Sequence, residues 1–235
     1  MIWVGTSGYS YPQWKDRFYP KGLPATKMLA HYASKLPTVE INNTFYKRPT
    51  KEQLGAWATQ TPSSFRFAFK ASRYFSAGTG LRDDKAVADF YALLAHVGPR
   101  LGPVLVQLPN HIEKDVALLA RFLDGAGTHR TATALDLVHP SWRGDDVDAL
   151  LRERDVALCV TEEDDSPLSW RTTARWAYVR LRKKRYAARA LSAWATRLLA
   201  EVEGDAYVFF KHEDDAPKHA LSLLRYVGKG SSTIS

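Results

Sequence analysis

The sequence has a single cysteine, Cys159, and it has no long apolar run. One thiol excludes an internal disulfide and any metal site built from several thiolates. Cys159 lies inside the apolar run 156–160, where a small buried hydrophobe is the simplest interpretation. No stretch approaches the roughly 18 consecutive apolar residues of a membrane span, and residues 1–5 lack the basic start of a signal peptide. These absences predict a cytoplasmic protein that has no membrane partner.

The compositional extremes of disordered and fibrous chains are also missing. The 235 residues are 45% hydrophobic and 25% charged, which is typical of a soluble globular protein. This length suits one domain of ordinary size. We therefore expect a single domain over residues 1–228, followed by a flexible tail over residues 229–235.

The positive charge is concentrated in one part of the chain. Lysine and arginine number 33 against 25 acidic residues, which gives a formal net charge of +8. Residues 166–200 hold nine basic residues and no acidic one, so the rest of the chain, with 24 basic and 25 acidic residues, is nearly neutral. The basic segment, residues 171–189, predicts a site for an anionic ligand or nucleic acid, or else a solvated loop.

Short apolar runs alternate with helix-like patterns along the chain. The stretches between the runs place apolar residues three and four positions apart, as on one face of a helix. The alternation of strand-like and helix-like patterns repeats eight times, and no GxGxxG or Walker loop is present. Both observations favour a single-domain α/β fold, a TIM-like (β/α)₈ barrel, over an open doubly wound sheet. The predicted strands are residues 2–6, 38–41, 65–70, 104–107, 133–137, 157–160, 177–181 and 206–211.

Polar residues occur where the predicted strands end. In a parallel barrel these ends meet at one face, which is where active sites of this architecture lie. The alternative is that charged pairs such as Glu40 with Lys70, or Asp136 with Arg180, simply fill the mouth of the barrel. We favour a functional site, although strand alternation alone leaves open which side of each strand faces the barrel axis.

Four of these residues have side chains suited to catalysis. Glu40 and Asp136 are acid–base candidates, and Lys70 is an electrostatic stabiliser or, alternatively, a Schiff-base nucleophile. His139 follows the fifth predicted strand and is either a proton carrier or a structural hydrogen-bonding group. Carboxylates and histidines also suit a metal ion, but no diagnostic ligand spacing is present. We therefore assign no metal site and leave the cofactor open.

The other candidates are expected to bind substrate. Arginines hold phosphate or carboxylate groups in bidentate geometry, and amide side chains orient a ligand. The connection over residues 7–26 is long and aromatic, as lids over sites often are, and rings near strand ends stack on ligands or seal loops. The predicted binding residues are Tyr9, Trp14, Asn42, Gln107, Arg180, Arg182, Tyr186 and His212.

Seven distinctive motifs occur in order along the chain. They are residues 5–14 (GTSGYSYPQW), 39–46 (VEINNTFY), 67–71 (FAFKA), 102–109 (GPVLVQLP), 139–142 (HPSW), 178–181 (YVRL) and 209–214 (FFKHED). Together they resemble the YecE-like family, domain of unknown function 72, over nearly the whole chain. The resemblance implies a TIM-like barrel and no established reaction.

The chain departs from that family's pattern at three positions. The family tends to read Glu-x-Arg-His before Ser-Trp, whereas this chain has Asp136 in place of the acid and Val138 in place of the arginine. Where many members carry a histidine after the Arg-Leu of the seventh strand, Arg182 stands here. Roles of the missing arginine and histidine therefore do not transfer to this chain.

The leading hypothesis is an enzyme that acts on a small polar, anionic substrate at the carboxyl-terminal face of the barrel. One alternative is a nucleic-acid-binding or phosphodiester-processing protein that uses the basic segment on the phosphate backbone. A further alternative is a non-catalytic ligand-binding barrel. The sequence leaves the reaction and the oligomeric state open.

Overall fold

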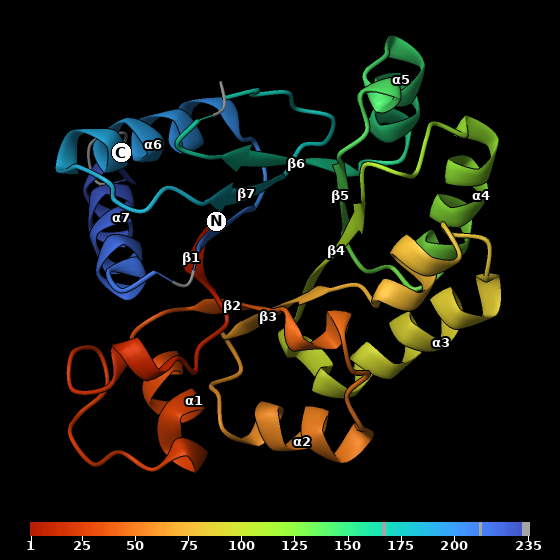
Figure 1. Cartoon of the computed structure of the whole chain (residues 1–235). Helices are drawn as coiled ribbons and strands as arrows, with labels where there is room; N and C mark the ends of the chain where they lie inside the picture. Colours follow the sequence, from red (N-terminus) through yellow and green to blue (C-terminus); the bar gives the residue numbers. More distant parts are fainter. Residues whose placement is uncertain (166–167, 212, 232–235) are drawn as a thin grey trace.

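The chain folds into a closed barrel of eight parallel strands, as the alternation of patterns predicts (Figure 1). The computed structural model describes residues 1–165, 168–211 and 213–231. Each strand pairs with the next strand of the chain, and β1 pairs with β8 to close the ring. The strands are β1 (Ile2–Ser7), β2 (Thr38–Ile41), β3 (Arg66–Lys70), β4 (Leu101–Leu108), β5 (Thr133–Leu137), β6 (Ala157–Glu162), β7 (Ala177–Leu181) and β8 (Ala206–Phe210).

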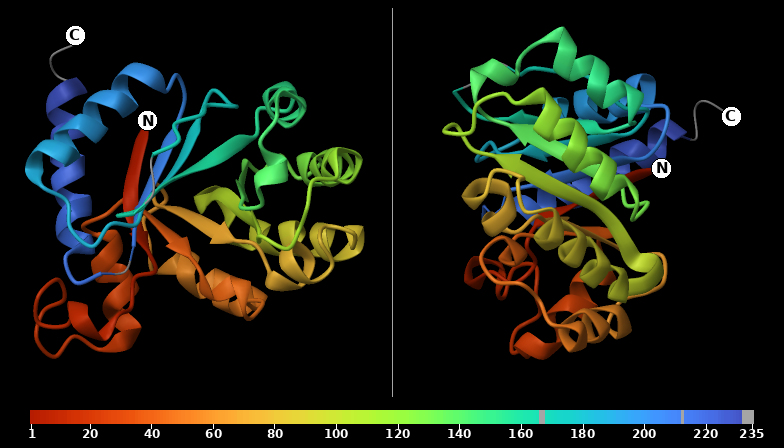
Figure 2. Two further views of the ribbon diagram at one scale, coloured as in Figure 1. Left: turned by 45° about the horizontal axis from the view of Figure 1, so that its top comes forward. Right: turned by 90° about the vertical axis from the view of Figure 1, so that its right-hand side faces the viewer.

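Helices cover the outside of the barrel (Figure 2). Within the described part of the β6–β7 connection there is no helix, so this crossover differs from the regular alternation. Among the residues that the structure describes, no helix has both the length and the apolar composition needed to cross a bilayer. The α-helices are α1 (Ala25–Ala33), α2 (Lys51–Thr59), α3 (Asp84–Leu94), α4 (Val116–Gly127), α5 (Asp145–Glu153), α6 (Ala188–Glu201) and α7 (Ala216–Ser231).

Helix α7 extends further than the sequence suggests. It runs to Ser231, so residues 229–231, which the composition assigned to a flexible tail, lie within a helix. Residues 232–235 lie outside the described residues. Residues 229–231 thus continue α7, since adding residues to an existing helix costs less free energy than starting one.

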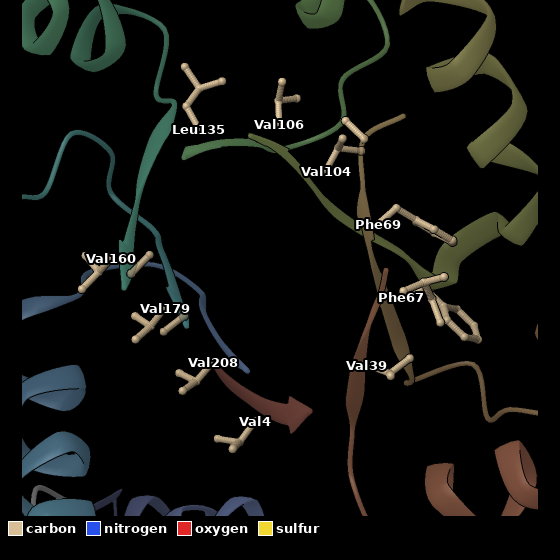
Figure 3. Packing of buried hydrophobic residues seen from close by; sticks show 14 of the residues in the cluster. Val4, Val39, Phe67, Phe69, Val104, Val106, Leu135, Val160, Val179 and Val208 are labelled. Carbon is tan, nitrogen blue, oxygen red and sulfur yellow. The ribbon is translucent and has the colours of Figure 1, made fainter. Parts of the chain in front are cut away.

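Strand alternation separates two layers of side chains. Outward-facing residues such as Val39, Phe67 and Val179 are buried between the strands and the surrounding helices (Figure 3). Inward-facing residues fill the barrel, where Trp3 stacks on Tyr207 with ring centroids 6.1 Å apart. These rings close the amino-terminal end of the barrel. The polar inward-facing residues lie at the opposite, carboxyl-terminal end.

Close approach of β1 and β2 depends on Gly5. A Cβ atom at this position would lie 2.0 Å from the carbonyl oxygen of Thr38, far inside van der Waals contact. Because both partners are backbone in a closed sheet, neither can move away cheaply.

Replacing Gly5 by alanine should therefore lower the free energy of unfolding by about 3 kcal/mol. The matched control is Gly125→Ala on the exposed surface of α4, where an added Cβ meets nothing within 4 Å. That change should raise the stability by about 0.5–1 kcal/mol, because alanine is the better helix former. Urea denaturation of both variants measures the contrast. Equal stability of the two would contradict the steric argument.

Candidate functional site

A cavity of about 550 Å³ opens at the carboxyl-terminal end of the barrel. Its walls come from the ends of β3 to β7 and the loops that follow them. The charged groups among the described lining residues are five cations and two carboxylates: Lys70, Arg143, Arg171, Arg180, Arg182, Asp136 and Glu163. The lining therefore carries an excess of positive charge, although two of its cations pair with carboxylates outside the lining, Arg180 with Glu40 and Arg171 with Asp148.

A buried ion pair forms the floor of this cavity. Glu40 on β2 is fully buried, and the Arg180 side chain on β7 is only 6% exposed. The Arg180 guanidinium donates to Glu40 Oε1 at 3.0 Å. Ser7 Oγ donates to the same oxygen, and the Tyr178 hydroxyl donates to Oε2, each at 2.7 Å. Glu40 thus accepts three hydrogen bonds from β1 and β7 across the barrel interior, and it is not among the residues that line the cavity.

The partners of Glu40 determine its protonation. Burial by itself raises the pKa of a carboxyl, but the Arg180 charge and the Tyr178 and Ser7 hydrogen bonds outweigh burial and hold the pKa of Glu40 below its ordinary value. Burial likewise opposes the charge of Arg180, yet the neighbouring Glu40 carboxylate raises the pKa of this guanidinium above its usual value. Both groups are charged at neutral pH.

Acid should therefore weaken the fold through Glu40. A carboxyl whose folded pKa lies below its unfolded value of about 4.3 stabilises the protein above that pH. This contribution disappears as the pH falls through the folded pKa. We expect the wild type to lose stability from about pH 5 downward more steeply than Glu40→Gln, which lacks the titrating group. Urea denaturation between pH 7 and pH 3 measures the difference, and parallel curves would contradict it.

A second chain of polar groups forms one wall of the cavity. Lys70 Nζ on β3 donates to Gln107 Oε1 on β4 at 2.8 Å. The same amide donates through Nε2 to Asp136 Oδ2 on β5 at 2.6 Å. Asp136 also lies 3.9 Å from the Arg180 guanidinium, and its side chain is 18% exposed. Gln107 thereby fixes a lysine and a partly exposed carboxylate on either side of it.

Lys70 occupies an unusual environment for a lysine. It makes no ion pair with any carboxylate of the described residues, and the face of Phe45 lies 4.3 Å from Nζ. Burial and the nearby Arg180 charge lower the pKa of Lys70 below its ordinary value, although Glu40 and Asp136 oppose the shift. A lowered lysine pKa is typical of functional amines.

The structure brings five of the predicted residues together around the cavity. The side chains at the ends of β3, β4, β5 and β7 point toward the barrel axis. The sequence pattern left open which side of each strand faces that axis. Arg182, just beyond β7, lines the cavity and pairs with Glu163 at 3.1 Å. The five lining residues are Lys70, Gln107, Asp136, Arg180 and Arg182.

The aromatic residues Tyr9 and Trp14, which the sequence analysis placed in a lid, are not among the residues that line the cavity. Trp14 is completely buried, and its indole nitrogen donates to the Glu213 carbonyl at 3.1 Å. The loop after β1 is thereby fastened to the loop after β8, so Trp14 belongs to the core. Tyr9 and Asn42 line a separate pocket of about 120 Å³ beside Trp57. The buried Oδ1 of Asn42 has no hydrogen-bond partner among the described residues.

The remaining predicted residues lie away from the lining. His139 accepts a hydrogen bond from the Ser141 backbone through Nδ1 at 3.2 Å and so caps the short helix over Pro140–Trp142. Tyr186 is buried against Phe210, with ring centroids 5.4 Å apart, and seals a loop. His212 lies outside the described residues. His139 and Tyr186 follow the ends of β5 and β7, but neither is among the residues that line the cavity.

Several residues of the site were missed from the sequence. Tyr178 lies two positions before Arg180 on β7, and this spacing was the signal that both face inward. Arg143 and Arg171 come from loops, for which no periodic signal exists. Cys159 lines the cavity instead of lying in the outer core, and burial raises the pKa of its thiol. Within the described residues, no group of three or more histidine, cysteine or acidic side chains is arranged to hold a metal ion.

The basic segment is largely neutralised by carboxylates. It lies against the acidic residues 162–164, and it reaches further carboxylates elsewhere in the barrel. The pairs are Arg171–Asp148, Arg175–Asp155, Arg180–Glu40, Arg182–Glu163 and Lys183–Glu162.

Comparison with known sequences extends these observations. A family model described as "Protein of unknown function DUF72" matches residues 3–234. The UPF0759 protein YecE of Escherichia coli (strain K12) is 33% identical over 126 residues, which are 53% of this chain and 44% of YecE. The UPF0759 protein YunF of Bacillus subtilis (strain 168) is 32% identical over 71 residues, 30% of this chain and 24% of YunF. These matches span less than half the length of the curated relatives.

Solved structures share the fold. A DUF72 family protein of Thermotoga maritima MSB8 superposes with a TM-score of 0.77 and 22% identity, over 97% of this chain and 99% of that one. A DUF72 family protein of Enterococcus faecalis V583 gives the same TM-score at 18% identity, over 97% and 96% of the two chains. The D-psicose 3-epimerase of Clostridium cellulolyticum H10 superposes with a TM-score of 0.62 at 9% sequence identity. The superposition covers 97% of this chain and 98% of the epimerase.

Proposed function

The chain belongs to the DUF72 family of proteins of unknown function, and from this premise we propose that it is an enzyme acting on a small anionic substrate in the barrel cavity. The observation that carries the proposal is the charge of the lining. Five cations and two carboxylates surround a cavity of about 550 Å³, a size that suits a small molecule. Low-dielectric walls strengthen such a field and draw anions into the cavity.

The cations of the lining divide into two groups. Arg180 and Arg171 are committed to carboxylates outside the lining, Glu40 and Asp148. Arg182 pairs only with the half-exposed Glu163, and Arg143 makes no ion pair with the described residues. A phosphate or carboxylate would therefore be held by Arg182 in bidentate geometry, with Arg143 close to the opening.

The chemistry would take place between Lys70 and Asp136. Asp136 is the partly exposed carboxylate of the lining that Gln107 orients, and it is the acid–base candidate. Lys70 places a positive charge on the same wall, where it would stabilise negative charge that develops on the substrate. Gln107 holds both groups in place.

The ion pairs of the basic segment favour this proposal over nucleic-acid binding. A phosphate backbone would have to compete with the carboxylates that already pair with Arg171, Arg175 and Lys183. Lys184, Arg185 and Arg189 are exposed and form no ion pair within the described residues, so they are the groups of the segment through which nucleic acid would bind.

Titration of anions against variants tests the proposal. Inorganic phosphate, phosphorylated sugars and small carboxylates are titrated by calorimetry into the wild type, Arg182→Ala and the control Arg185→Ala. Loss of a charged hydrogen bond should weaken the tightest anion by about 10- to 100-fold in Arg182→Ala and leave Arg185→Ala unchanged. Arg182 is preferred to Arg180 as the target because replacing Arg180 would leave Glu40 buried and unpaired.

Two results would contradict the proposal. Equal weak binding of the whole panel by the wild type and Arg182→Ala would remove the anion site. Salt-dependent binding of DNA or RNA that is lost in a Lys184→Ala, Arg185→Ala double variant would support the nucleic-acid alternative instead. Anion binding without turnover of any bound compound would leave a ligand-binding barrel.

A further inference from the structure

Lys70 has the surroundings of an amine that forms a covalent bond with its substrate. Nζ lies in the lining of the cavity, within reach of a bound molecule. Its one hydrogen-bond acceptor in the described residues is the neutral amide of Gln107. A lysine that only neutralised charge would be expected to pair with a carboxylate, as Lys183 does with Glu162 at 3.0 Å.

The orientation of Lys70 is set from both sides. Thr44 Oγ1 donates to the Lys70 carbonyl oxygen at 2.6 Å and fastens the short helix Asn43–Phe45 to the end of β3. The Phe45 ring consequently covers one side of Nζ at 4.3 Å, while Gln107 holds the other side. Burial and the nearby Arg180 charge oppose the ammonium form of this amine, while the Phe45 ring face and the Gln107 oxygen hold Nζ in place at the cavity wall.

A proton-transfer group and an anion-binding group stand on the same cavity. The Asp136 carboxylate is bound to the far side of the Gln107 amide, and Arg182 lines the wall beyond β7. Resting on the proposed function, the geometry points to Lys70 as the nucleophile that forms an imine with a small aldehyde or ketone bearing a carboxylate or phosphate group.

The covalent step balances with groups of the site. The Nζ lone pair attacks the carbonyl carbon, the C=O electron pair moves to oxygen, and a proton passes from nitrogen to that oxygen to give a carbinolamine. The proton that the Lys70 ammonium loses before the attack is taken up by the Asp136 carboxylate. The resulting Asp136 carboxyl then returns this proton to the hydroxyl, which leaves as water while the nitrogen lone pair closes the C=N bond. The products are one water molecule and a protonated imine, whose charge the Asp136 carboxylate faces. No oxidant or further reactant is needed.

Reductive trapping tests this inference. The wild type is incubated with glyoxylate and cyanoborohydride, which transfers hydride to the imine carbon and leaves a stable secondary amine. Peptide mapping by mass spectrometry then compares labelling at Lys70 with labelling at Lys85, whose side chain is 84% exposed. We expect Lys70 to react at least about tenfold faster, because the bound anion places the carbonyl next to Nζ.

Matched reagents and variants make the result specific. Acetaldehyde offers a carbonyl without an anionic group, so the labelling of Lys70 relative to Lys85 should fall with this reagent. The same ratio should fall when glyoxylate is used with Arg182→Ala. Lys70→Arg should still bind inorganic phosphate by calorimetry while no cavity adduct forms. Phosphate binding with no preference for Lys70 would overturn the imine and leave the proposed function standing. If phosphate does not bind and the carbonyl reagents do not label Lys70 preferentially, the result would count against both the imine and the proposed function.

Discussion

Glu40→Gln should lower the free energy of unfolding by about 3–5 kcal/mol, because it leaves the Arg180 guanidinium buried without a counter-charge. Arg180 remains charged, and its side chain, only 6% exposed, cannot turn toward water without opening the top of the barrel. The amide introduced by this substitution also cannot accept all the hydrogen bonds that Ser7, Tyr178 and Arg180 donate to the carboxylate. Urea denaturation at pH 7 measures the loss.

The control is the same substitution in an exposed ion pair. Glu153 pairs with Arg154 at 3.1 Å, and its side chain is 72% exposed. Glu153→Gln should cost less than about 1 kcal/mol, since water screens the pair and solvates the remaining charge. A loss in Glu40→Gln no larger than in Glu153→Gln would show that the floor of the cavity is not the buried charge pair described above.

A double variant separates the pair from its surroundings. Arg180→Met removes the guanidinium but keeps an unbranched side chain. Combined with Glu40→Gln it should destabilise the protein by less than the sum of the two single changes, because no buried charge is left unpaired. Strict additivity would indicate that Glu40 and Arg180 contribute independently.

Trp14→Ala should destabilise the fold by about 3–5 kcal/mol. The indole is completely buried, packs edge-on against Tyr11 at a centroid distance of 4.9 Å, and donates to the Glu213 carbonyl. Truncation leaves a cavity under the loop after β1 and removes the indole donor from a carbonyl in the loop after β8. Thermal and urea denaturation give the loss.

The comparison that distinguishes a core role from a lid role uses Tyr46, another aromatic side chain in a strand-end loop. Tyr46 is 77% exposed, so Tyr46→Ala should change stability by no more than about 0.5 kcal/mol. If Trp14 were a lid, its replacement would weaken anion binding while stability stayed close to that of the wild type. Retained affinity in the folded fraction of Trp14→Ala would agree with the core role.

The strands were the most predictable part of the fold. The expected runs at 38–41, 133–137 and 177–181 coincide with β2, β5 and β7, because each is a short apolar run bounded by polar or turn residues. The expected run at 104–107 is longer in the structure, Leu101–Leu108, since Gly102 and Pro103 look like turn residues and yet occupy β4. Proline is tolerated there despite being rare inside sheets.

The site was predictable in part. Residues at strand ends must lie on one face of a parallel barrel, so Lys70, Gln107 and Asp136 were found from position alone. Residues in loops were harder, because their direction depends on contacts with distant segments. Trp14 turns into the core through a contact 199 residues away, and His139 turns onto its own short helix.

The sequence by itself determined the barrel, its strand order and the concentration of charge at one end, because local periodicity and chain order are sufficient for these features. Only the tertiary structure decided that Glu40 lies under the cavity while Asp136 opens into it, and that most cations of the basic segment are already paired. These outcomes depend on which side of each strand faces the axis and on charges brought together from up to 140 residues apart. A pattern of period two is the same for both faces of a strand, so it cannot distinguish them.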